Sequence, residues 1–345
     1  KFFKKKMTNI ILTFTSATIF VLIINFILKK NKILLNFSGQ NHQIYTKKKS
    51  IPLSGGLVIF LFLLINYNNF EIKTIFFFFL IFLVGLFADI NIFKSPTIRF
   101  FIQILLIINF IIFLDLSIND VRIFYINNLL NNNYFNIFFT TFCLLVLING
   151  SNFIDGNNTL SLGYFGLIFF TLLSLENVVF AKIDENIIYS ILVTIIVLYF
   201  FNIANKLYLG DNGVYLLSSI TGYILIDFFK SNPSISPYFI VNLLWYPAFE
   251  ILFSFLRKLK SKYSPMRPDT FHLHQLIYFK ISKRFSSNLV LPNSLTGNLI
   301  NIYNGFIFLA SSTNIYNTKM QLLILFINIT IYTLLYLLFF KKWKT

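Results

Sequence analysis

The sequence predicts an all-α protein: a polytopic transmembrane helix bundle with about 11 spans. Of the 345 residues, 57% are hydrophobic and only 12% are charged, with 46 Phe and a mean hydropathy of +0.74. A soluble domain carries about a quarter charged residues, so one water-exposed fold cannot bury this much apolar surface. Apolar runs of about 17–20 residues, the length that a helix needs to cross a bilayer, recur without a long soluble insertion. We therefore expect residues 1–345 to form a single integral membrane domain.

The expected spans follow one another along the whole chain. Basic residues and no small-residue cleavage site follow the first run, so we expect it to be a span and not a cleaved signal peptide. The expected spans are 9–28, 52–68, 74–90, 98–115, 135–149, 161–176, 186–203, 213–229, 238–256, 299–312 and 321–340. The single Cys143 lies within an apolar run, which excludes an intrachain disulfide.

The placement of positive charge predicts the orientation of the bundle. One set of loops, together with the C-terminal tail, holds 19 Lys and Arg, and such loops face the cytoplasm. We therefore expect the N-terminus outside and the C-terminus in the cytoplasm. The N-terminal Lys residues conflict with this orientation, and a start at Met7 would remove the conflict. The cytoplasmic loops are 29–51, 88–98, 149–160, 204–212 and 257–298.

The net charge of +17 lies largely in loops beside the spans. We expect these loops to set topology and to meet anionic lipid headgroups, and we expect no nucleic-acid partner. Four carboxylates come from four separate cytoplasmic segments: Asp89, Asp155, Asp211 and Asp269. In a helical bundle these segments can converge on one basin at the cytoplasmic surface. Glu250 differs from them because it lies inside an expected span.

Asp89 ends one span, and Arg99 and Gln103 lie one turn apart at the start of the next. Because residues four apart share a helix face, Arg99 and Gln103 should point the same way. Taken singly, the Arg can set topology and the Asp can cap a helix. The segment alone therefore leaves a structural role and a functional role open.

Two further junctions between spans are rich in polar residues. The segment Asn149–Asn158 offers amides and a carboxylate that can hydrogen-bond a nucleotide or a sugar, although it can also be a plain polar loop. The segment Gly210–Gly213 places Asp211 between two glycines. Its sequence is typical of a turn, but a carboxylate there can also hold Mg²⁺, which bridges to substrate phosphates.

Two of the three histidines of the chain, His272 and His274, lie close to Arg267 and Asp269. Such a group can bind phosphate or orient a pyrophosphate. Zinc is the rival ligand, but it requires further Cys, His or carboxylate side chains. A solvated basic loop is the third interpretation of this segment.

Taken together and in this order, five segments resemble the polyprenyl-phosphate N-acetylhexosamine-1-phosphate transferases, or glycosyltransferase family 4. The resemblance covers nearly the whole chain. The family patterns are P-x-x-G-G, G-L-x-D-D, N-x-x-N-x-x-D-G, x-G-D-x-G and D-x-x-H-x-H. In the same order, the matching segments are Pro52–Gly56, Gly85–Asp89, Asn149–Gly156, Leu209–Gly213 and Asp269–His274.

The resemblance implies a reaction in which a polyprenyl phosphate attacks the β-phosphate of a UDP-sugar and UMP leaves. It implies Mg²⁺ as the cofactor, with Mn²⁺ as the alternative, and a bacterial inner membrane enzyme whose active site faces the cytoplasm. The His loop is more similar to the GlcNAc-type enzymes of envelope polysaccharides such as O-antigen than to the pentapeptide translocase. Homodimers occur in the family. We therefore expect a UDP-N-acetylhexosamine donor, undecaprenyl or another polyprenyl phosphate as acceptor, and the membrane as the site of action.

The resemblance also assigns roles to individual residues. Asp89, Asp155 and Asp211 would form the catalytic group, with Asp211 as the metal ligand. The expected substrate-binding residues are Asn149, Asn152, Arg267, Asp269, His272, His274 and Lys48. Lys48 belongs to a Lys triplet before Pro52, and its role toward the lipid phosphate is an extrapolation from position alone.

The chain departs from the family pattern at four positions. Ala88 replaces the first Asp of the D-D pair, Asn158 replaces a second Asp, and Val214 and Gln275 replace a Ser and a His. A polyprenyl phosphate is already ionised near neutral pH, so an obligatory base is not required. Two alternatives remain: a degenerate, non-catalytic paralogue, and a secondary transporter. A transporter is disfavoured because its ionisable residues would lie near the bilayer midplane in repeated halves.

Overall fold

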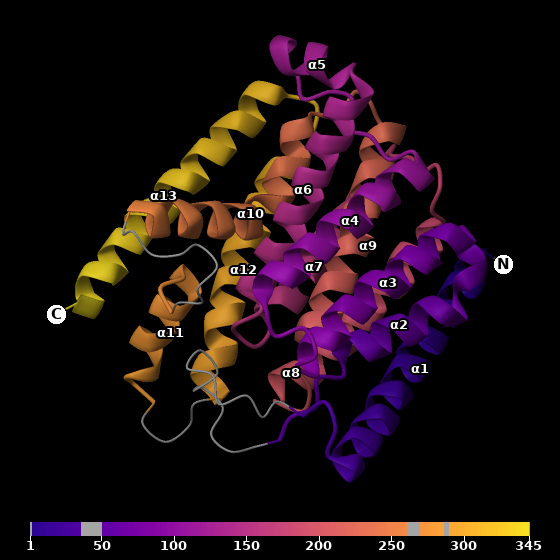
Figure 1. Cartoon of the computed structure of the whole chain (residues 1–345), viewed down its shortest axis with the longest axis vertical. Helices are drawn as coiled ribbons and strands as arrows, with labels where there is room; N and C mark the ends of the chain where they lie inside the picture. The colour runs from indigo at the N-terminus through magenta and orange to yellow at the C-terminus, as the bar shows by residue number, and fades with distance from the viewer. Residues whose placement is uncertain (1, 36–49, 261–269, 286–289, 345) are drawn as a thin grey trace.

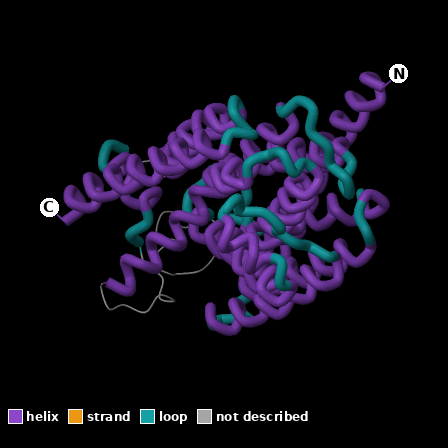
Figure 2. The backbone as a smooth tube through the Cα atoms, turned by 90° about the horizontal axis from the view of Figure 1, so that it is seen from above, coloured by secondary structure: helices purple, strands orange, loops and turns teal. Residues whose placement is uncertain are grey.

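Thirteen α-helices form the described part of the chain, and no strand is present there (Figure 1). The computed structural model describes residues 2–35, 50–260, 270–285 and 290–344. The helices are α1 (Phe2–Asn31), α2 (Gly55–Ile65), α3 (Ile72–Asp89), α4 (Pro96–Leu114), α5 (Phe124–Leu130), α6 (Asn133–Ile154), α7 (Leu160–Ser174), α8 (Glu185–Ile203), α9 (Gly210–Ser231), α10 (Pro237–Lys260), α11 (Leu273–Ser282), α12 (Val290–Ser312) and α13 (Thr318–Lys344). The view from above in Figure 2 shows the same packed bundle, and the prediction of an all-α membrane protein is confirmed.

Each of the 11 predicted spans falls on one of these helices. Eight helices are long and apolar enough to cross a membrane: α1, α3, α4, α6, α8, α9, α10 and α13. The apolar helices α2 and α7 are shorter. Helix α12 is long but carries Asn at four positions, at residues 293, 298, 301 and 304. The exact number of crossings and the side on which each end lies therefore stay predictions.

Local sequence signals explain where several helices begin. Ser95 precedes α4, its hydroxyl accepts a hydrogen bond from Ile98 N at 3.5 Å, and Pro96 occupies the first turn. Asp184 caps α8 in the same way, through Asn186 N at 2.9 Å. These residues satisfy backbone N–H groups that have no partner inside the helix, and Pro loses nothing at such a position.

Pro247 acts differently, because it lies inside α10. There its ring removes one helical hydrogen bond and crowds the preceding turn. Figure 1 shows the part of the chain labelled α10 crossing the direction of α12.

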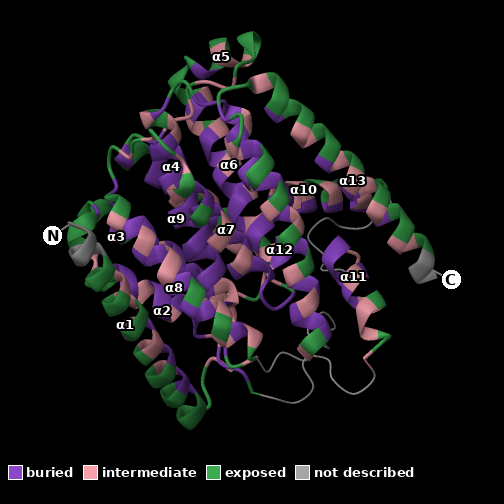
Figure 3. Cartoon of the chain, turned by 180° about the vertical axis from the view of Figure 1, so that it is seen from behind, coloured by how far each residue is buried: buried purple, intermediate pink, exposed green. Residues whose placement is uncertain are grey.

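Helix α9 forms the centre of the bundle. Nearly all of its residues are buried, and it packs against α2, α3 and α6. In contrast, α1 and α13 lie at opposite flanks, and many of their side chains are exposed (Figure 3). Because exposed Leu, Ile and Phe cover these flanks, lipid is the solvent that suits them.

Polar connections join the loops at each end of the bundle. At one end, Lys182 N donates to Asp227 at 3.1 Å, and Arg122 bonds the carbonyl oxygens of Ser234 and Tyr316 at 2.6 and 3.1 Å. The other end gathers the C-terminal ends of α1, α3, α6 and α8 and the N-terminal ends of α2, α4, α9 and α12. We call this the site end. It is formed by the described parts of the loops that the sequence analysis assigns to the cytoplasm.

Candidate active site

Asp89 lies at the last position of α3 and accepts hydrogen bonds from the first turn of α9. Its Oδ1 accepts from Asp211 N at 3.0 Å, and its Oδ2 accepts from Asn212 N at 2.9 Å and from Asn212 Nδ2. A carboxylate at a helix N-terminus satisfies free N–H groups and favours the helix dipole. Asp89 therefore caps α9 from a neighbouring helix and fixes the backbone that carries Asp211.

Glycines allow the backbones around Asp211 to approach closely. A Cβ added at Gly85 would lie 2.5 Å from Asn212 Cα, and one added at Gly56 would lie 2.4 Å from Gly213 N. Gly210 has a φ of +75°, in the left-handed region that glycine tolerates best. The glycines of three predicted motifs are thus packed against one another at the start of α9.

Arg99 provides a positive charge directly at Asp211. Its Nη1 lies 2.5 Å from Asp211 Oδ2, and the two side chains are 20% and 25% exposed. One turn further along α4, Gln103 Oε1 accepts a hydrogen bond from Asn149 Nδ2 at 3.0 Å. These contacts agree with the prediction that Arg99 and Gln103 share a helix face. The hydrogen bond to Gln103 holds Asn149 close to Arg99 and Asp211.

Asp155 follows α6 and completes a group of three carboxylates. Burial, followed by the charges of Asp211 and Asp89, raises the pKa of Asp155 well above its usual range. The three Asp residues expected to be catalytic are therefore close enough to influence one another. The structure brings Asp89, Asp155 and Asp211 together from three different helix ends.

The Asn side chains of the loop between α6 and α7 hold this loop against other parts of the protein. Asn158 is buried, and its Nδ2 donates to Asn205 Oδ1 at 3.2 Å, while Asn157 Nδ2 donates to Asn293 Oδ1 at 2.7 Å. Asn152, in the last turn of α6, is half-buried. Asn158, which stands where the family has an Asp, thus ties the loop to the connection between α8 and α9.

The two histidines lie together on a carboxylate that the sequence analysis did not assign to the site. Glu250 is 1% exposed, its Oε2 lies 3.0 Å from His272 Nδ1, and its Oε1 lies 3.7 Å from His274 Nδ1. A Cβ added at Gly156 would lie 3.2 Å from His274 Nε2, so the histidines adjoin the turn that follows Asp155. The signal for Glu250 was present, because a carboxylate inside a span calls for a partner.

Three predicted substrate-binding residues cannot be placed against this geometry. Lys48, Arg267 and Asp269 lie outside the described residues. Their roles therefore stay predictions, and the described site rests on the helix ends and on the histidine pair.

The donor set fits a hard divalent cation bound partly by substrate. Across the described residues, no group of three or more His, Cys, Asp or Glu side chains is arranged to enclose a metal ion. Mg²⁺ needs no such cage, since it usually takes one or two carboxylates and completes its shell with phosphate oxygens and water. Burial is the main cause of the raised pKa of Asp155, and the charges of Asp211 and Asp89 add to it, so the group concentrates negative charge that suits a cation.

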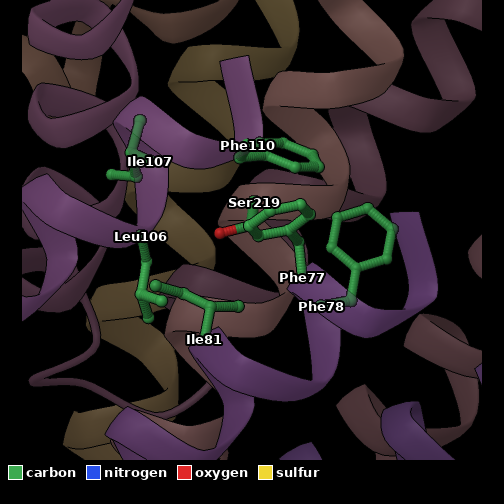
Figure 4. Close-up of a pocket in the computed structure, with 7 residues that line it drawn as sticks. All are labelled: Phe77, Phe78, Ile81, Leu106, Ile107, Phe110 and Ser219. Atoms are coloured by element: carbon green, nitrogen blue, oxygen red, sulfur yellow. The ribbon is translucent and has the colours of Figure 1, made fainter. Parts of the chain in front are cut away.

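A small apolar pocket lies elsewhere, between α3, α4 and α9 (Figure 4). Its lining residues are Phe77, Phe78, Ile81, Leu106, Ile107, Phe110 and Ser219. Ser219 follows Asp211 by about two helical turns, or ~12 Å along α9. With no charged residue in its lining, the pocket is not part of the carboxylate group.

Comparisons with known proteins match the central part of the chain. Residues 72–229, just under half of the chain, match the family described as glycosyl transferase family 4. An undecaprenyl-phosphate alpha-N-acetylglucosaminyl 1-phosphate transferase of Thermotoga maritima is 32% identical over 104 residues. This similarity covers 30% of the present chain and 34% of the Thermotoga protein. The similarity to the Thermotoga protein thus spans about a third of that relative. The family match, over residues 72–229, includes Asp89, Asp155 and Asp211.

Proposed function

We propose that the chain, whose residues 72–229 match glycosyl transferase family 4, transfers a sugar 1-phosphate from a UDP-sugar to polyprenyl phosphate. The observation that carries the proposal is the group of Asp89, Asp155, Asp211 and Arg99 at one end of a membrane bundle. A lipid phosphate reaches such a site from the bilayer, and a nucleotide reaches it from the water. Under this proposal, the protein lies in a bacterial inner membrane and its site end faces the cytoplasm.

In the proposed reaction, a phosphate oxygen of the lipid attacks the β-phosphorus of the UDP-sugar. The bond from this phosphorus to the oxygen that bridges the two phosphates breaks, and UMP leaves with that oxygen. Phosphoryl transfer depends mainly on positioning and on stabilising charge. Mg²⁺, held by Asp211, would supply charge stabilisation for the phosphate oxygens when it is bound.

The protein residues in this proposal have separate tasks. Asp89 holds the first turn of α9 in place, so that Asp211 presents its carboxylate at a fixed position. Asp155 adds negative charge to the cation site. We propose that His272 and His274, which adjoin the turn after Asp155, help to bind the sugar diphosphate. Ala88 leaves one carboxylate fewer than the family pattern, and an ionised lipid phosphate needs no base to attack.

The name of the Thermotoga relative supports N-acetylglucosamine as the sugar. We therefore propose UDP-GlcNAc, or a related UDP-N-acetylhexosamine, as the donor and undecaprenyl phosphate as the acceptor. The product would be a lipid-linked sugar diphosphate that starts an envelope polysaccharide. A panel of UDP-sugars tested on the purified protein would identify the donor.

Asp211→Asn tests the proposal most directly. The substitution removes the charge that holds the cation, and we expect Mg²⁺-dependent UMP release to fall by at least about 10³-fold, a loss on the scale of removing one key electrostatic group. The measurement is UMP release from UDP-GlcNAc with undecaprenyl phosphate in detergent micelles.

Asp227→Asn is the matched control, because Asp227 lies at the other end of α9, where it accepts from Lys182 N. We expect this variant to keep UMP release near that of the unmodified chain. Near-normal turnover by Asp211→Asn would refute the role of Asp211.

A degenerate paralogue remains the second candidate because Ala88 and Asn158 depart from the family pattern. Under that alternative, the native chain would be silent and Ala88→Asp would be active. A secondary transporter is opposed by the position of the three Asp residues at helix ends.

A further inference from the structure

The ion pair between Arg99 and Asp211 places a protein cation where the proposed metal ligand lies. Arg99 Nη1 is 2.5 Å from Asp211 Oδ2, and both side chains remain partly exposed. A divalent ion that binds Asp211 would meet the guanidinium at the same carboxylate. Two positive groups cannot share one carboxylate without repulsion, which is strong where water is partly excluded.

The guanidinium itself is incompletely satisfied. Arg99 Nε is buried and has no hydrogen-bond partner within the described residues. Arg99 lies in the first turn of α4, and the loop before this helix ends at the Ser95 cap. Because a long side chain on a fixed helix end can change rotamer at low cost, the guanidinium can leave Asp211 without moving α4.

Two other acceptors near Arg99, Asp89 and Gln103, are already occupied. Both carboxylate oxygens of Asp89 accept hydrogen bonds from the first turn of α9. Gln103, one turn along α4, is fully buried and bonded to Asn149. An Arg displaced from Asp211 can therefore pair with an anion that enters the site, and its planar fork suits a phosphate group.

We propose that Arg99 is an internal counter-ion that competes with the divalent cation for Asp211 and, once displaced, binds a phosphate oxygen of the substrate. The substrate part rests on the proposed function, whereas the competition with the cation does not. By thermodynamic linkage, a diphosphate that takes up Arg99 must also strengthen cation binding. The site would thus favour the arrival of cation and diphosphate together over the binding of either one alone.

The test measures Mn²⁺ binding by electron paramagnetic resonance on the purified full chain in detergent. Arg99→Gln removes the competitor, and we expect Mn²⁺ to bind roughly tenfold tighter, a change of about 1.4 kcal/mol. Lys94→Gln, which removes the same charge from an exposed residue before α4, should change the affinity less than about twofold. This control separates local competition from a general change in charge.

Arg99→Lys keeps the positive charge and serves as a second variant in case Arg99→Gln does not fold. We expect it to bind Mn²⁺ nearly as weakly as the unmodified chain. UDP, a soluble diphosphate probe, should tighten Mn²⁺ binding in the unmodified chain and should do so less in Arg99→Gln. Unchanged or weaker Mn²⁺ binding in Arg99→Gln, or equal tightening in Lys94→Gln, would overturn the proposal.

The Mn²⁺ measurement needs no transferase activity. If the native chain failed to release UMP but Arg99→Gln still bound Mn²⁺ tighter, the proposed function would fail and the competition would stand. If UMP release were confirmed and Mn²⁺ binding did not respond to Arg99, the inference would fail alone.

Discussion

Asp89 and Asp211 are in direct contact but have different surroundings. Asp89 receives three hydrogen bonds from the first turn of α9, so its oxygens are occupied by the protein. Asp211 faces Arg99 and is a quarter exposed. Asp89 therefore has a structural role, because it fixes the start of α9, whereas Asp211 is available to ligands. The two residues have these different roles although both stand in motifs that contain Gly and Asp.

His274 yields a prediction on pH. Burial lowers the pKa of His274, against the opposing influence of Glu250. The folded protein then binds fewer protons than the unfolded chain, whose His has a pKa of about 6.5. Stability that is present above this value is lost as the pH falls toward the folded pKa. The raised pKa of Asp155 acts in the opposite direction. We therefore expect His274 to lower the unfolding temperature in detergent between pH 7.5 and pH 5.5 relative to a variant that lacks this ring.

His274→Gln provides the comparison, because it removes the titrating ring and keeps a polar side chain. As the pH falls, the unfolding temperature of the unmodified chain should decrease relative to that of this variant. Parallel pH profiles for the two proteins would contradict the assignment to His274.

At the scale of elements, the site depends on how closely α9 approaches α2 and α3. Gly55 N donates to Tyr208 O at 3.1 Å, and Tyr208 N donates to Pro52 O at 2.9 Å. These bonds hold the start of α2 against the residues before α9. The glycine-rich motifs thus act as contact surfaces between helices, and Asp211 is positioned by helices that lie far apart in the sequence.

Gly85→Ala tests this contact. The added methyl group would lie 2.5 Å from the backbone of Asn212, and backbone cannot yield as a side chain does. We expect a loss of about 1–3 kcal/mol of stability, typical of overpacking, and a large fall in UMP release because Asp211 moves. Thermal unfolding in detergent and the UMP assay measure the two effects.

Gly166→Ala is the matched control in α7, since its added Cβ would meet only Ile195 Cγ2 at 3.5 Å. Alanine also favours the helix by up to about 1 kcal/mol, so this variant should be neutral or more stable. Equal behaviour of the two variants would show that the close approach of α3 and α9 is not critical.

The sequence predicted the helices and most motifs, but not the pairing between them. Runs of apolar residues mark the helices because each must bury its backbone bonds within itself. The ion pair of Arg99 with Asp211, and the contact of Glu250 with His272, depend on helix tilt and rotation. Sequence periodicity does not report these quantities, so Glu250 seemed an isolated charge inside a span.

At the scale of the whole molecule, the two ends of the bundle differ in composition. The site end contains the three clustered Asp residues and the histidines, together with the described ends of the loops that are rich in Lys and Arg. The opposite end holds Arg122, Lys182 and Asp227 in hydrogen bonds with neighbouring loops. The orientation of the bundle across the membrane stays a prediction from its positive charge.

Labelling of single cysteines tests the orientation. In a Cys143→Ser background, Lys94→Cys lies at the site end and Glu176→Cys lies at the opposite end, and both positions are exposed. We expect a membrane-impermeant maleimide to label Glu176→Cys in spheroplasts, and Lys94→Cys only after the membrane is opened. The reverse pattern would place the site end outside the cytoplasm.

The central position of α9 has a consequence for biosynthesis. Of the eight candidate spans it is the least apolar, and 94% of its most apolar stretch is buried among other helices. Such a segment partitions weakly from the translocon into lipid on its own. Its partners α2, α3 and α6 all precede it in the chain, so they are synthesised before it emerges. The order of translation thus prepares a docking place for α9, and the Asp211 site forms only when this late helix is inserted.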